Sequence, residues 1–106
     1  MINITLNGVS DTGYYTDVFL KTFTINPSPE GLLATFTIVA DVTTHTIEDV
    51  RNKVDGNNTF GIEVIESGNR NGVYAVNSKP IIVQSEVDAS EGIGVLFVGT
   101  RIFQPK

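Results

Sequence analysis

The chain has 106 residues, of which 41% are hydrophobic, so it is long enough to form one domain with its own core but not two domains. Its formal net charge is −5 and its basic residues are scattered, which argues against a nucleic-acid partner and against an anionic membrane surface. It contains no cysteine, and this excludes disulfide bonds and thiolate metal sites.

Short β-strands are predicted along most of the chain, because apolar and polar residues alternate between turn signals that recur about every ten residues. In chain order, the predicted strands are Ile2–Asn7, Asp17–Asn26, Leu32–Val42, Thr59–Glu66, Val73–Ser78, Pro80–Val87 and Ile93–Gln104. The clearest is Leu32–Val42, whose even-numbered residues form an apolar face while the opposite face is expected to meet water. In Asp17–Asn26, Phe19 and Phe23 are expected to share one side. In Thr59–Glu66, Phe60 is expected to point inward.

One segment departs from this alternation and predicts a helix at Ile47–Val54. Thr46 can cap its first turn, and Ile47, Val50 and Val54 would share one face. We expect this helix to plug an open end or edge of the β-structure.

Two further features belong to this helix: Asp49 can reach Lys53 four residues later, and Asp55-Gly56 would end the helix. The expected fold is therefore all-β. It is an antiparallel β-sandwich or partly open barrel of about seven short strands with one short helix, forming a single domain over residues 1–106.

The last predicted strand, Ile93–Gln104, is apolar on both faces around Val95–Val98. One interpretation is a central strand that is covered on both sides within the domain. The other is that its second face, which includes Val98 and Ile102, is covered by another protein chain. Arg70 lies between two asparagines at a predicted hairpin tip. It could bind a carboxylate of that neighbour, or it could be a turn residue that only increases solubility.

No catalytic group can be assembled from the sequence. His45 is the only histidine, and without a nucleophile motif it is more typical of a surface or capping residue than of a catalytic one. The residues from Asp55 to Glu66 partly match an EF-hand calcium loop, but Phe60 occupies the sixth position, where that loop requires glycine. We therefore expect a protein that is not an enzyme and that holds no metal and no cofactor.

Tyr14 and Tyr15 follow a turn sequence, and exposed rings at this place could stack on a sugar or anchor a protein contact. Alternatively, one ring closes the end of the sandwich while the other lies on the surface. The pair keeps open a second function, that of a carbohydrate-binding β-sandwich module, although the chain has no tryptophan.

Taken together, four features resemble small virion accessory proteins of bacteriophages, such as capsid decoration (cement) proteins and tail or baseplate components. These are the polar start without a signal peptide, the lack of cysteine, the acidic Thr- and Asn-rich strand pattern, and the two-sided apolar last strand. Such proteins often trimerise and clamp neighbouring capsid subunits.

The resemblance implies a structural protein that is made in the host cytoplasm and located in the virion, where it stabilises an assembly by protein–protein contacts. Its partners would be copies of itself, capsid subunits or tail subunits. A regulatory or inhibitory protein with another partner is a third possibility.

Overall fold

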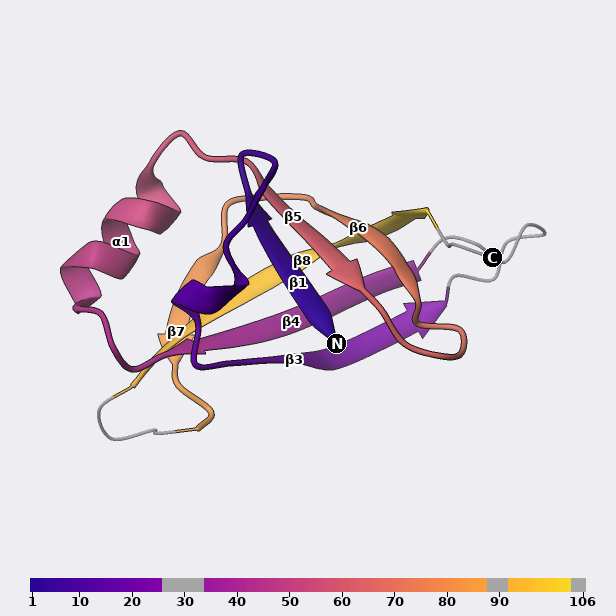
Figure 1. Ribbon diagram of the computed structural model, residues 1–106, viewed down its shortest axis with the longest axis horizontal. Coiled ribbons are helices and arrows are strands. Elements are labelled where there is room, and N and C mark those ends of the chain that lie inside the picture. The colour runs from indigo at the N-terminus through magenta and orange to yellow at the C-terminus, as the bar shows by residue number, and fades with distance from the viewer. Residues whose placement is uncertain (26–33, 88–91, 104–106) are drawn as a thin grey trace.

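A computed structural model describes residues 1–25, 34–87 and 92–103 (Figure 1). Its elements are β1 (Ile2–Leu6), β2 (Val9–Ser10), the 3-10 helix η1 (Thr12–Tyr14), β3 (Asp17–Ile25), β4 (Ala34–Val42), α1 (Ile47–Asp55), β5 (Phe60–Val64), β6 (Gly72–Val76), β7 (Ile81–Gln84) and β8 (Ile93–Phe103). All seven predicted strands and the helix are present. The strand β2 and the helix η1 were not predicted, and the predicted strand ends at 26, 32–33 and 104 lie outside the described residues.

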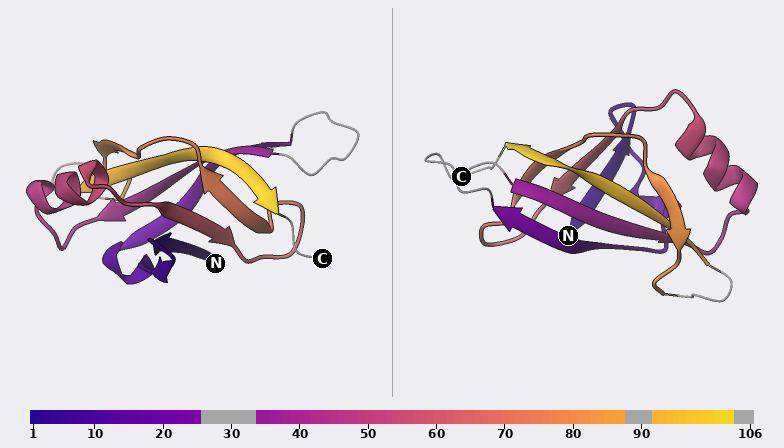
Figure 2. Two further views of the ribbon diagram at one scale, coloured as in Figure 1. Left: turned by 90° about the horizontal axis from the view of Figure 1, so that it is seen from above. Right: turned by 180° about the vertical axis from the view of Figure 1, so that it is seen from behind.

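The strands form one sheet in the order β2-β1-β5-β6-β8-β4-β3, and β7 pairs with β8 as well. Every pairing is antiparallel. The sheet curls over itself, so that β1 and β5 cross in front of β3, β4 and β8 (Figure 1) and the two layers face each other (Figure 2). The expected all-β, sandwich-like fold is confirmed.

The strand β8 lies in the middle of this sheet. Its first residues pair with β7, its last residues pair with β6, and β4 runs along its other side. The interpretation of the last strand as a central strand is therefore confirmed as far as its backbone is concerned. Its side chains, however, do not all lie in the core.

The core lies between the two layers. On β4, the even-numbered residues from Ala34 to Val42 are at most 1% exposed, as the alternation predicts. The buried side chains of β8 beside them, Val95 and Phe97, belong to the same layer, and those of β5, namely Phe60, Ile62 and Val64, come from the layer that crosses it. This burial of apolar area is the main term that stabilises a chain without disulfides.

A β-bulge between Leu20 and Thr22 changes the alternation of β3. Leu20 points to the core before the bulge and Phe23 points to the core after it, whereas Phe19 lies on the other side, opposite Val39. The prediction that Phe19 and Phe23 share a side is wrong, because the extra residue at the bulge shifts the period of two by one position.

The helix α1 begins as predicted. The backbone amide of Asp49 donates to Oγ1 of Thr46 at 3.1 Å, and the amide of Thr46 donates to Oδ2 of Asp49 at 3.4 Å, which completes a capping box. Val50 and Val54 are buried in the core, where they close the open side of the sheet next to β7. Of the predicted three-residue apolar face, Val50 and Val54 are buried, whereas Ile47 at the first turn is 43% exposed.

Candidate functional site

The side of β3, β4 and β8 that points away from the core carries small β-branched residues in two rows. The register places Thr24, Thr35 and Thr100 opposite one another in one row, and Thr22, Thr37 and Val98 in the next. We call these six residues the grid. The hydroxyl oxygens of Thr22 and Thr37 lie 2.6 Å apart, so they form a cross-strand hydrogen bond.

Both apolar residues singled out on β8 are exposed. Val98 belongs to the grid and is 38% exposed, whereas Ile102 is 63% exposed and lies at an irregularity in the pairing of β8 with β6, between Arg101 and Phe103. On β7, the pairing partner of Leu96 is Ile81, which is 54% exposed. The helix α1 does not cover these residues, because its buried side chains face the core.

A charged side chain adjoins the grid at the bulge of β3, where Lys21 directly precedes Thr22, and its contacts lead toward Asp41 at the end of the sheet where β3 begins. The amide of Glu86 donates to Oδ1 of Asp41 at 2.9 Å, and the carboxylate of Glu86 binds Nζ of Lys21 at 2.5 Å. Val39 and Asp41 are at most 1% exposed, although they lie on the face of β4 that was expected to meet water. That expectation is wrong at these two residues, because the chain after β7 folds back onto this end of β4.

The turn between β5 and β6 contains Arg70, which is exposed. Its backbone carbonyl accepts a hydrogen bond from the hydroxyl of Tyr74, and the carbonyl of Asn69 accepts one from Arg101. Arg101 is only 1% exposed and lies on the core side of β8, where it pairs with the buried Tyr74 of β6. The turn is thus held toward the core side of the sheet, and a contact of Arg70 with another chain stays a prediction.

Arg101 was not singled out from the sequence. Its guanidinium carbon lies 5.4 Å from the ring centroid of Phe23, and its pairing partner on β6 is Tyr74. The one signal that could have revealed its burial is parity: Arg101 lies two and four residues after Gly99 and Phe97, on the same side of the strand. Together, Arg101 and Tyr74 close this end of the core.

Tyr15 is not exposed, which agrees with the alternative in which one ring closes the end of the sandwich and not with a loop of two exposed rings. Its side chain is 8% exposed and packs edge-on against Phe97, with 6.3 Å between the ring centroids. Burial raises the pKa of its hydroxyl far above the ordinary value for tyrosine. Tyr15 therefore closes the end of the core, because the 3-10 helix before it turns its ring inward.

Tyr14 is half-buried and covered by two neighbours. Its ring stacks on His45 with 4.0 Å between centroids, and Nζ of Lys53 lies 4.0 Å from the centroid of the same ring. Lys53 also pairs with Asp11 at 2.7 Å, so the predicted pairing of Lys53 with Asp49 is wrong. Burial raises the pKa of the Tyr14 hydroxyl, as do the negative charges of Asp49 and Asp11.

The two tyrosines therefore do not form an exposed aromatic platform. A sugar-stacking site needs a ring face open to solvent, and here one ring is buried and the other is occupied by His45 and Lys53. The carbohydrate-binding alternative loses the feature on which it depended.

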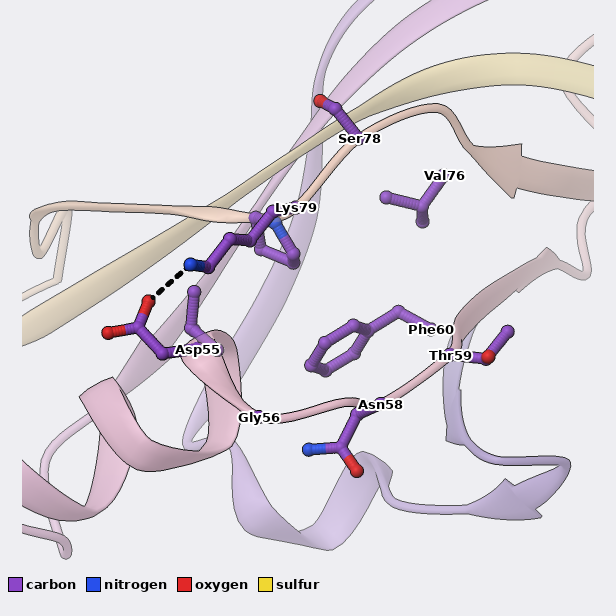
Figure 3. A pocket seen from close by; sticks show the side chains of 10 residues that line it. Asp55, Gly56, Asn58, Thr59, Phe60, Val76, Ser78 and Lys79 are labelled. Atoms are coloured by element: carbon purple, nitrogen blue, oxygen red, sulfur yellow. Dashed lines mark ion pairs between the residues drawn. The ribbon is translucent and has the colours of Figure 1, made fainter.

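A pocket of about 350 Å³ opens between the end of α1, the start of β5 and the connection from β6 to β7 (Figure 3). The side chains of Phe60 and Val76 point into it, and the ion pair between Nζ of Lys79 and Oδ1 of Asp55, at 2.9 Å, borders it. The amide of Asn58 is engaged in the fold, since its Nδ2 donates to a backbone carbonyl at 2.9 Å. This volume is at the lower end of the range for small-molecule sites.

The oxygen-rich stretch from Asp55 to Glu66 does not converge on one point. Asp55 ends α1 and binds Lys79, whereas Glu66 follows the far end of β5. The five residues of β5 between them span about 16 Å, which is much longer than the 2.3–2.6 Å of a calcium–oxygen contact. The two carboxylates therefore cannot bind the same ion.

Added calcium is accordingly expected to leave the melting temperature unchanged, because an ion that binds no site in the native state contributes no stabilisation. Differential scanning fluorimetry with calcium and with magnesium at equal ionic strength measures this directly. A rise in melting temperature that is specific to calcium, and that disappears in Asp55→Ala, would contradict the expectation.

Comparisons with protein family models, with curated proteins and with solved structures found no match to this chain. Within the described residues, no helix is long and apolar enough to cross a membrane. The functional argument therefore starts from the surfaces described above.

Proposed function

We propose that this protein is a non-enzymatic structural protein that is held in a larger protein assembly through the grid side of its sheet. The observation that carries the proposal is the exposure of two apolar residues of β8: Val98 within the grid, at 38%, and Ile102 near the end of the same strand, at 63%. Exposed apolar side chains on a strand favour association with another protein surface that covers them.

The chemistry of the grid favours a protein partner. The protein carries a net charge of −5, yet the grid consists only of threonine and valine. A nucleic acid would need clustered lysine and arginine, and a sugar would need an open aromatic ring. The partner that fits is a protein surface of uncharged, β-branched and aliphatic side chains, which can pack closely against an equally small-featured sheet.

The assembly that we propose is a virion, with this protein in the role of a capsid decoration or tail component. What supports this choice is that the acidic Thr- and Asn-rich β-fold without cysteine resembles small virion accessory proteins. Its partners would then be other copies of this chain and the surrounding capsid or tail subunits.

Replacing the two apolar residues by threonine, in Val98→Thr/Ile102→Thr, is expected to abolish attachment while leaving the fold intact. Both side chains are exposed, so little core packing is lost. The free energy of unfolding should therefore change by less than about 1 kcal/mol. The measurement is sedimentation of the recombinant protein with virus particles purified from the source of the sequence, with circular dichroism as the check on folding.

The matched control is Val9→Thr/Ile65→Thr, which makes the same two chemical changes at residues that are 69% and 44% exposed and lie outside β8. The control is expected to sediment like the wild type. Equal attachment of both variants would remove the grid side from the interface, and unfolding of Val98→Thr/Ile102→Thr alone would show that these residues stabilise the domain rather than an assembly.

A further inference from the structure

The outer strand β3 presents a second surface, its unpaired edge. In the described part of the chain, β3 pairs with β4 on one side only, and it is nine residues long. An edge strand offers a row of backbone amides and carbonyls to which another strand can add.

The first half of this edge is protected and the second half is not. The carboxylate of Asp17 accepts a hydrogen bond from the amide of Val18 at 3.0 Å, and the bulge next to Lys21 interrupts regular pairing. Both features hinder the addition of a strand. The run Thr22–Ile25 that follows has no charge, no proline and no bulge, and it consists of residues that favour strands.

The same run already pairs with a copy of its own sequence. Thr22-Phe23-Thr24 on β3 lies antiparallel to Thr35-Phe36-Thr37 on β4, with threonine opposite threonine and phenylalanine opposite phenylalanine. In this pairing the threonines lie on the grid side, and the aromatic rings point to the core. The tripeptide Thr-Phe-Thr is therefore compatible with itself in an antiparallel sheet. On β3, the edge of this tripeptide that points away from β4 is unpaired within the described residues.

The core side of this run is also incompletely covered. Phe23 is only half-buried and Ile25 is 38% exposed, whereas their partners on β4, Phe36 and Ala34, are at most 1% exposed. An additional strand on this edge would cover the apolar side chains of β3 as β3 covers those of β4.

We infer that a second copy of this chain is the occupant of the edge, and that β3 of one copy pairs antiparallel with β3 of the other around a two-fold axis at Phe23. Thr22 then lies opposite Thr24 of the other copy, and Phe23 lies opposite its own equivalent. This register keeps threonine on the grid side and phenylalanine on the core side. It joins the two sheets and places both grids on the same side, as an isologous dimer does.

This dimer does not rest on the proposed assembly, because it uses the edge of β3 rather than Val98 and Ile102. Since the paired run is short, the dissociation constant is expected to lie between about 1 μM and 1 mM. Sedimentation equilibrium over this concentration range is the first measurement. A wild-type protein that stays monomeric up to about 1 mM overturns the inference.

The register is tested by introducing charged side chains at two exposed residues of β3, Thr22 and Thr24. In Thr22→Glu/Thr24→Glu, each glutamate faces a glutamate of the other copy, and the dissociation constant is expected to rise at least about tenfold. In the matched variant Thr22→Lys/Thr24→Glu, each lysine faces a glutamate, and the dissociation constant is expected to stay within about threefold of the wild type. Equal effects of the two variants, in either direction, overturn the proposed register.

A second measurement serves if the charged variants do not fold. The chain has no cysteine, so that single cysteines introduced by Thr22→Cys and Thr24→Cys have no background. Directly opposed strand residues lie about 4.5–5.5 Å apart between Cα atoms, which suits a disulfide. On mild oxidation, a mixture of the two variants is expected to form cross-linked dimers, and neither variant alone is expected to do so. Cross-linking of the single variants to the same extent as the mixture overturns the register, as does a mixture that does not cross-link.

Discussion

Phe36→Ala should lower the free energy of unfolding by about 3–5 kcal/mol, because it removes a large side chain from a core that cannot fully collapse around the gap. Phe36 is 1% exposed, and its ring meets Tyr74 edge-on with 4.7 Å between centroids. It also fills the space above Gly99, where a Cβ would come within 2.7 Å of the phenylalanine ring. Urea denaturation followed by circular dichroism measures the loss.

The control for this prediction is the neighbouring residue on the other side of the same strand. Thr35→Ala changes an exposed side chain of the grid and should cost less than about 1 kcal/mol. Losses of equal size at the two positions would mean that both sides of β4 are buried here, and the description of the grid as a free surface would then be wrong.

Gly99→Ala is expected to destabilise the protein by at least about 3 kcal/mol or to prevent its folding, although the change adds a single methyl group. A Cβ at this residue would overlap the backbone carbonyl oxygen of Ala75 on β6, besides its contact with the ring of Phe36. A backbone carbonyl cannot move aside as a flexible side chain does, so that β6 and β8 would have to separate. The measurement is again urea denaturation, or the yield of folded protein if the variant does not accumulate.

Gly13→Ala is the matched control, because a Cβ at Gly13 would meet no atom within 4 Å. It should leave the free energy of unfolding within about 0.5 kcal/mol of the wild-type value. A Gly99→Ala variant that is as stable as Gly13→Ala would show that β6 and β8 do not approach each other as closely as described.

Much of this fold could be predicted from local patterns. Alternation placed the even-numbered buried side chains of β4 and the buried side chains of β5 correctly, and Thr46 correctly marked the start of α1. These features depend on residues close together in the sequence, where the geometry of a strand or a cap leaves little freedom. The antiparallel sandwich-like class follows from the same patterns.

The failures arise where distant segments meet. The bulge in β3 accompanies an ion pair between Lys21 and Glu86, which are 65 residues apart, and no local pattern announces either feature. Similarly, a turn signal before Tyr15 indicates a loop, but it does not indicate that the loop turns its ring onto Phe97. Side-chain direction in such loops is set by tertiary packing.

The candidate interface was only partly within reach of the sequence. The two-sided apolar character of the last strand drew attention to Val98 and Ile102, and both are exposed, while their contact with another chain stays a prediction. The sequence offered two interpretations, a central strand or a strand covered by another chain, and the structure shows a central strand on which Val98 and Ile102 are exposed. The charge-free grid required the register of three strands, because its members come from segments far apart along the chain.

The central position of β8 has a consequence for how the chain is made. A ribosome releases β4, β6 and β7 before β8, yet β8 is the strand that joins them. Until Ile93–Phe103 has left the exit tunnel, the pieces β2-β1-β5-β6 and β4-β3 have no strand between them, and their inner edges stay unpaired. The sheet must therefore close after synthesis of this segment, through pairings of long sequence separation that form slowly. Until they form, unpaired strand edges are exposed and can aggregate.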